Sequence, residues 1–139
     1  MLPKQVRFTQ MRMLLNELVD GQTYWFSTST PPAKDLSQRA YLLPNFDEYI
    51  VGYTDRSAVF DASHPNKVDP RGNLLFSHTM VLDGRVVGTW KRTLTKDAVM
   101  LTPNLFTPLN TAETRAFAAA ANRYGAFLGR SVNATFQVE

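Results

Sequence analysis

The chain contains no cysteine among its 139 residues. This absence excludes disulfide bonds and every metal site that uses a thiolate, and it fits a reducing compartment. No run of about 18 apolar residues occurs, and the first residues lack the apolar stretch of a signal peptide. These absences predict a cytoplasmic protein with no membrane partner.

The common signatures of cofactor binding and nucleophilic catalysis are also missing. Gly72, Gly84 and Gly88 form no Gly-x-Gly-x-x-Gly pattern, and no Gly-x-Ser-x-Gly motif occurs. His64 and His78 are the only histidines, and neither has the spacing of a metal ligand pair. We therefore expect no cofactor and no metal, with His78 partly buried and hydrogen-bonded within a strand.

Three carboxylates lie in one aromatic-rich segment, at Asp47, Glu48 and Asp55. Paired carboxylates serve acid–base chemistry, so an enzyme that uses Asp47 or Asp55 is one hypothesis. The spacing is not diagnostic of that chemistry. Structural roles are the preferred interpretation, with Asp55-Arg56 as an ion pair or a turn.

The length of the chain predicts one domain with a hydrophobic core, and its charge is compatible with a nucleic-acid partner. The chain is 44% hydrophobic, and its 15 Lys and Arg against 12 Asp and Glu give a net charge of +3 and a pI near 9.4. This mild basic excess permits contact with nucleic acid without requiring it.

The N-terminal region predicts a small appendage joined by a linker. Apolar residues spaced by three and four over residues 5–18 predict an amphipathic helix, and residues 24–26 predict a short aromatic strand. Residues 27–40 contain adjacent prolines among Ser and Thr, which predicts a linker. The expected division is 1–26, 27–40 and a main body at 41–139.

A β-hairpin is the clearest local prediction in the main body. Asp83-Gly84 separates two β-prone runs, residues 76–82 and 85–92, and this dipeptide favours a two-residue turn. An unbroken register would place Thr79 opposite Gly88 and Ser77 opposite Trp90. Trp90 would then share a face with Val81 and Val86, while Arg85, Val87, Thr89 and Lys91 would line the other. Gly88 itself suggests a bulge or a close strand crossing.

The remaining elements complete an α+β fold. Residues 98–102 predict a third strand, and residues 111–128 predict a helix with a cap at Asn110 or Thr111 and an end at Gly129. Residues 131–139 could add an edge strand or fray.

The segments before the hairpin are less clearly patterned. Residues 46–53 could form helical turns or an irregular strand, residues 58–60 are β-prone, and residues 61–67 could start a turn or a short helix. We expect a curved antiparallel sheet or small open β-barrel closed by the C-terminal amphipathic helix. The expected apolar stripe of the 111–128 helix consists of Phe117, Ala120, Ala121, Tyr124, Phe127 and Leu128.

Four cations lie on or near the predicted hairpin, at Arg85, Lys91, Arg92 and Lys96. A basic β-ribbon can lie along a phosphate backbone or enter a groove. Exposed strand edges also carry charges that prevent aggregation. The sequence leaves both explanations open.

An ordered series of segments resembles a known family. The segments are LVDGQTYWF (18–26), LLPNFDEY (42–49), YTDRS (53–57) and VLDGRVVGTW (81–90). They are similar to the C-terminal part of bacterial winged-helix DNA-binding proteins, which include DNA glycosylases that unhook crosslinks and alkylated bases. The resemblance implies a winged-helix remnant at 1–26 and a β-rich, barrel-like domain after it.

The resemblance also implies a function. In that family several winged helices precede the β-rich domain, which helps to hold DNA near its backbone, and the catalytic motif of the glycosylases lies in the N-terminal region. We therefore expect a noncatalytic module that binds or positions duplex DNA through Arg56, Arg85, Lys91, Arg92 and Lys96. Alternatives are a module that self-associates through the aromatic stub or a sheet edge, and part of a DNA glycosylase.

Overall fold

The computed structural model describes residues 14–29, 39–61 and 74–136. The chain divides into two compact units, Met1–Asp35 and Leu36–Glu139. Most of the predicted linker, His64 and the turn or helix start expected at 62–67 lie outside the described residues. The three-part division at residues 26 and 40 therefore stays a prediction.

The described part of the first unit is a two-stranded antiparallel hairpin, β1 (Leu14–Val19) and β2 (Gln22–Ser27). The aromatic strand expected at 24–26 is confirmed, whereas the helix expected over 5–18 is wrong for residues 14–18. The turn explains the error: Asp20 and Gly21 have φ values of 48° and 80°, and such a two-residue turn pairs its flanks as strands. Residues 5–13 lie outside the described part of the chain.

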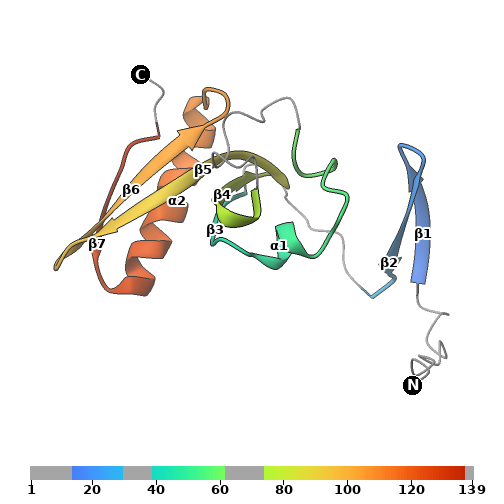
Figure 1. The fold of residues 1–139 in the computed structure, drawn as a ribbon, viewed down its shortest axis with the longest axis horizontal. Coiled ribbons are helices and arrows are strands. Elements are labelled where there is room, and N and C mark those ends of the chain that lie inside the picture. Colours follow the sequence, from blue (N-terminus) through green and yellow to red (C-terminus); the bar gives the residue numbers. More distant parts are fainter. Residues whose placement is uncertain (1–13, 30–38, 62–73, 137–139) are drawn as a thin grey trace. The chain divides into compact units, whose positions relative to one another are not determined.

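The second unit is built on a strongly curled, half-barrel sheet of five strands (Figure 1). The strands follow one another across the sheet in chain order, and each neighbouring pair is antiparallel except the last, which is parallel. The predicted α+β class with a curved sheet is confirmed, and the C-terminal tail supplies an edge strand. The strands are β3 (Ala40–Leu43), β4 (His78–Leu82), β5 (Arg85–Leu94), β6 (Ala98–Leu105) and β7 (Ser131–Ala134).

The hairpin of β4 and β5 turns at Asp83-Gly84, as expected, but its register contains a bulge. Val81 pairs with Val86, whereas Met80 pairs with Gly88, so Val87 is the extra residue. The predicted pairs beyond that point are wrong by one residue, and Trp90 lies opposite His78. A bulge reverses the alternation of faces, which is why Trp90 does not pack with Val81 and Val86.

Gly88 allows this irregular crossing. A Cβ atom built at Gly88 would lie 2.7 Å from the backbone oxygen of Asn104 on β6. The close approach of the two backbones leaves no room for a side chain, as the strand glycine suggested. The bulge and the close crossing both occur at this point of β5.

The C-terminal helix, α2 (Thr111–Leu128), has the predicted bounds. Asn110 and Glu113 form a reciprocal capping box, with N···O distances of 2.8 and 2.9 Å, and Gly129 closes the helix with a φ of 63°. The predicted apolar stripe is correct except at Phe127, which is 84% exposed. Leu128 and Tyr124 are only partly buried at the edge of the core.

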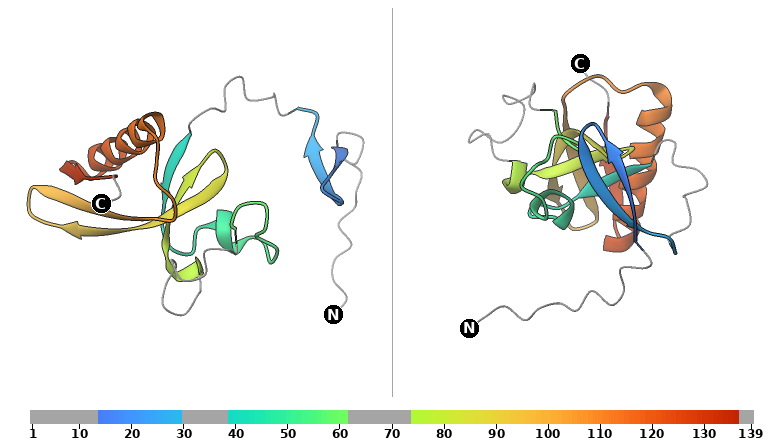
Figure 2. Two further views of the ribbon diagram at one scale, coloured as in Figure 1. Left: turned by 90° about the horizontal axis from the view of Figure 1, so that it is seen from above. Right: turned by 90° about the vertical axis from the view of Figure 1, so that its right-hand side faces the viewer.

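α2 covers one face of the sheet and forms the main core there (Figure 2). Phe117 is fully buried, and Trp90 stacks edge-on against Tyr124 at a ring distance of 5.5 Å. The Trp90 indole also donates to the carbonyl oxygen of Leu43 at 3.0 Å. Buried members of this cluster are Ala40, Met80, Leu82, Trp90, Val99, Leu101, Phe117, Ala120, Ala121 and Phe136.

A second, smaller core lies on the opposite face, where the segment after β3 folds back over the sheet. It contains the short helix α1 (Glu48–Val51), a 3₁₀ turn η3 (Leu74–Phe76) and the turns at 56–60. The helical reading of residues 46–53 is therefore confirmed over four residues, and residues 58–60 form turns rather than a strand. Its buried residues are Ile50, Val81, Val86 and Phe106.

The second core covers only part of its face. It extends over β3, β4 and the start of β5, and the outward residues farther along β5 and β6 are exposed. The sheet is therefore covered on both faces near α1 and on one face beyond it. Within the described residues, no helix is long and apolar enough to cross a membrane.

Candidate nucleic-acid interface

The five cations expected to bind DNA fall into two groups along β5. Arg85 begins the strand, and Lys91 stands six residues later, a separation of about 20 Å for extended chain. Arg92 follows Lys91, and Lys96 lies in the turn between β5 and β6. Arg56 shares a hollow with Arg85 at the opposite end of the strand. The structure thus does not bring all five together.

We name the two regions by residue range. The distal end comprises residues 91–100 and 130–133, and the proximal end comprises residues 39–61 and 82–86. The distal end holds Lys91, Arg92, Lys96 and Arg130 with one carboxylate, Asp97. The proximal end holds Arg39, Arg56 and Arg85 with five carboxylates, Asp47, Glu48, Asp55, Asp61 and Asp83. Positive charge therefore collects at the distal end.

The distal half of the β5–β6 ribbon presents an uncovered polar face. Lys91 pairs with Thr102, Thr89 pairs with Asn104, and the amide of Asn104 donates to the Thr89 hydroxyl at 3.4 Å. Lys91, Thr102 and Asn104 are exposed on the side away from α2. Figure 1 shows this ribbon, yellow to orange, extending to the turn at 95–97. Its side chains are hydrogen-bond donors of the kind that contact phosphates.

Arg92 lies on the other face of the same ribbon. Its guanidinium donates to the Tyr124 hydroxyl and lies 6.0 Å from the centre of that ring. These contacts attach the end of β5 to α2. Arg92 and Lys91 are adjacent in the sequence and lie on opposite faces of the strand.

Sequence reasoning missed Arg130, which joins the distal group through the tertiary structure. Its guanidinium donates to the carbonyl oxygen of Thr95 at 2.7 Å. The turn beside it is closed by Thr95, whose backbone N–H and hydroxyl both bond the oxygen of Ala98. Lys96 is therefore displayed from an ordered turn. No local pattern in the sequence marks Arg130, because 34 residues separate it from Lys96.

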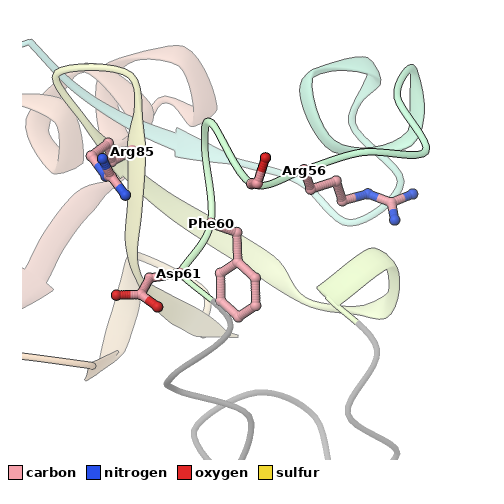
Figure 3. A pocket seen from close by; sticks show the side chains of 5 residues that line it. Arg56, Phe60, Asp61 and Arg85 are labelled. Atoms are coloured by element: carbon pink, nitrogen blue, oxygen red, sulfur yellow. The ribbon is translucent and has the colours of Figure 1, made fainter. Parts of the chain in front are cut away.

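Arg56 and Arg85 line a hollow of about 390 Å³ with Ser57, Phe60 and Asp61. Figure 3 shows Arg85 and Asp61 on one side of the Phe60 ring, while the Arg56 side chain points away from that ring. The Arg56 Nε donates to the carbonyl oxygen of Ile50 at 2.7 Å, which anchors the loop after α1. Contact of Arg56 and Arg85 with DNA stays a prediction. Their surroundings at the proximal end are less basic than the distal end.

The candidate acids have structural partners. The Asp47 carboxylate caps α1 by accepting from the backbone N–H of Tyr49 at 2.9 Å. The Asp55 carboxylate accepts from the backbone N–H of Ser57, also at 2.9 Å. The described residues contain no group of three or more His, Cys, Asp or Glu that could hold a metal. These contacts give Asp47 and Asp55 structural roles in a helix cap and a turn.

His78 packs edge-on against Trp90, with 4.9 Å between the ring centres. Burial lowers its pKa below the usual value of 6.5, and the nearby Arg92 charge lowers it further. The imidazole is consequently neutral at physiological pH, and His78 serves the packing at the end of β4. An unbroken register would have placed His78 opposite Thr89, but the bulge places it opposite Trp90.

The known proteins that are similar to this chain are named as DNA glycosylases. A family profile described as DNA glycosylase AlkZ-like matches residues 5–127. The solved structure of Streptomyces sahachiroi DNA glycosylase AlkZ is similar, with a TM-score of 0.56 and 23% identity. That match covers 88% of this chain and 34% of the AlkZ chain, so the chain spans about a third of its length. No curated protein matches the chain.

The two comparisons carry different weight. At 23% identity the likeness to AlkZ shows a shared fold. The family profile extends over most of the sequence, from before the β1–β2 hairpin into the end of α2. It confirms the resemblance to the glycosylase-containing family. The chain therefore belongs to the AlkZ-like DNA glycosylase family.

Proposed function

We propose that this chain is a noncatalytic module that binds or positions duplex DNA through the distal end of its sheet. The observation that carries the proposal is the gathering of Lys91, Lys96 and Arg130 beside an uncovered face of Thr and Asn side chains. Cations and small donors of this kind bind phosphates independently of base sequence. Family membership supports DNA as the polyanion.

The noncatalytic part of the proposal rests on the acids. Asp47 and Asp55 hold backbone N–H groups in a helix cap and a turn, so each has a structural role. Base excision also requires a pocket that takes an unstacked base. We assign none of the described residues to such a pocket.

The test is fluorescence anisotropy with a duplex DNA probe over a salt series. Affinity should fall as salt concentration rises. In K91S/K96S the plot of log K against log salt should be shallower, with the magnitude of its slope reduced by about 2. At low salt the double variant should bind roughly tenfold to a hundredfold more weakly. The matched control is R39S/R115S, which removes the same charge from exposed positions outside the distal end.

Two results would count against this function. One is the absence of binding at low salt by the unaltered chain. The other is equal weakening in the distal variant and the matched control, since this would reduce the effect to net charge. R56S/R85S then measures what the proximal arginines contribute to the same binding.

A second candidate function is self-association through the first unit. The β1–β2 hairpin exposes seven large apolar residues, and an isolated two-stranded hairpin is marginally stable in water. Light scattering should show a concentration-dependent dimer that L18S/W25S abolishes. A monomer at high concentration would remove this candidate. The exposed residues are Leu14, Leu15, Leu18, Val19, Tyr24, Trp25 and Phe26.

The third candidate is participation in base excision. Its support is the family alone, because the chain spans about a third of the AlkZ structure. Release of alkylated bases from a damaged duplex by the isolated chain would establish it. A null result in that assay, with DNA binding intact, would favour the positioning role.

A further inference from the structure

A pocket at the proximal end is unlike the distal surface in its chemistry. It has a volume of about 360 Å³ and lies between β3, α1 and the β4–β5 turn. Most of its lining is aromatic or aliphatic, and its one ionisable carboxylate belongs to Asp47. We call it the tyrosine pocket, and its lining residues are Tyr41, Leu43, Asp47, Tyr49, Val81 and Gly84.

The two tyrosines come from different elements and are held differently. Tyr41 stands on the edge strand β3 opposite Val81, and 47% of it is exposed. Tyr49 is fixed by its hydroxyl, which donates to the backbone oxygen of Gly84, and burial raises its pKa above 10. Leu43 and Val81 belong to the second core and its edge. Phenol rings beside an aliphatic floor attract organic cations more strongly than they attract anions.

Asp47 is set in place by a strained backbone. Phe46 has a φ of 56°, which is uncommon for a bulky side chain, and its backbone N–H donates to the oxygen of Leu75 at 3.0 Å. Its ring, 54% exposed, meets Phe76 edge-on at 5.3 Å. The left-handed residue turns the chain from β3 into α1, so Asp47 and Tyr49 reach the same pocket.

Charge decides which kind of ligand fits. Glu48 and Asp83 are exposed neighbours of the pocket residues, and the proximal end carries more carboxylates than cations. A phosphate in the tyrosine pocket would be repelled by the Asp47 carboxylate, and a purely apolar ligand would desolvate that carboxylate without pairing it. A guanidinium can stack on aromatic rings and bond a carboxylate at once.

We propose that the tyrosine pocket binds an arginine side chain presented by a basic peptide segment of a partner protein. The rings of Tyr41 and Tyr49 receive the guanidinium, and Asp47 pairs with its charge. The site is separate from the distal surface and uses none of the cations expected to bind DNA.

The test is an NMR titration of the full chain with acetylated and amidated Gly-Arg-Gly-Arg-Gly. A peptide with citrulline in place of arginine has the same shape without the charge. We expect the arginine peptide to shift the amide signals of Tyr41, Asp47, Tyr49 and Gly84. It should bind about tenfold more tightly than the citrulline peptide, because both the stacking and the ion pair require the charge.

Two variants separate recognition from folding. Asp47→Asn keeps the helix cap, since Asn caps as well as Asp, and should weaken binding about tenfold. Tyr41→Leu keeps an apolar side chain at an exposed position and should weaken binding severalfold. K91S/K96S should bind the peptide as the unaltered chain does.

Several outcomes would overturn the proposal. Equal binding of the citrulline peptide would leave an apolar surface, and equal binding of a lysine peptide would remove the preference for guanidinium. Free arginine amide that binds as tightly as the peptide would make this a small-molecule site. Shifts of the same amides on addition of duplex DNA, or on concentration of the chain alone, would assign the surface to DNA or to a second copy.

Discussion

The two ends of the curled sheet differ in cover and in charge. The proximal end is packed on both faces, by α2 and by the α1 segment, and carries five carboxylates against three cations. The distal end is covered by α2 on one face and carries four cations against one carboxylate. One sheet can therefore present a surface suited to a polyanion and a pocket suited to a cation.

We expect the largest effect from a substitution that tests how far the stability of the distal end depends on packing against α2. Phe117→Ala removes a fully buried ring between helix and sheet and should lower the free energy of unfolding by about 3–5 kcal/mol. Urea unfolding measures the loss. Hydrogen exchange should show β6 losing more protection than β3, because the outer face of distal β6 has no second layer. Equal loss of protection throughout the second unit would mean that the two ends unfold as one.

Gly88→Ala tests the junction between the two ends. The added methyl would lie 2.7 Å from the Asn104 backbone oxygen, so β5 and β6 must separate locally. We expect a loss of about 1–3 kcal/mol in the free energy of unfolding, measured by thermal or urea unfolding. Wild-type stability in this variant would show that the strands can move apart without cost, and the bulge would then need another explanation.

Thr79→Val should stabilise the protein. Thr79 is fully buried on β4, and its hydroxyl oxygen has no hydrogen-bond partner among the described residues. Replacement by a side chain of the same shape removes that unpaired group and should raise the free energy of unfolding by about 1 kcal/mol. Thr89→Val is a control, because the Thr89 hydroxyl accepts from Asn104. Destabilisation by Thr79→Val would contradict the assignment of an unpaired hydroxyl.

The smallest expected effect is the pH dependence from His78. Its folded pKa lies below the unfolded value of about 6.5, so its stabilising contribution is full above that value and is lost as pH falls through the folded pKa. His78→Gln should flatten the stability profile in that acidic range. In Arg92→Gln, an NMR titration should show the His78 pKa moving upward, because the Arg92 charge is one of its two causes. An unchanged pKa would leave burial as the sole cause.

Local signals predicted the regular elements where neighbours in the sequence decide the structure. The caps at Asn110 and Gly129 placed α2 correctly, and Asp83-Gly84 placed the central hairpin. The same dipeptide at Asp20-Gly21 was a usable signal for the β1–β2 hairpin, but the helical spacing of apolar residues before it pointed the other way. A two-residue turn brings its flanks together directly, so it was the stronger signal.

The candidate site was less predictable for a geometric reason. Lys91 and Arg92 are neighbours in the sequence, yet alternation along a strand puts them on opposite faces, and Arg92 contacts Tyr124. Arg130 joins the distal cations only because β7 returns beside β6. The tyrosine pocket likewise combines residues of β3, α1 and the hairpin turn.

Motifs and contacts between near neighbours are enough to predict the family, the α+β class, the central hairpin and the bounds of α2. They do not show which cations share a face, where the bulge reverses the alternation or which part of the sheet stays uncovered. Those features depend on the close crossing of β5 and β6 at Gly88 and on the packing of distant segments. No periodicity within one strand specifies such contacts.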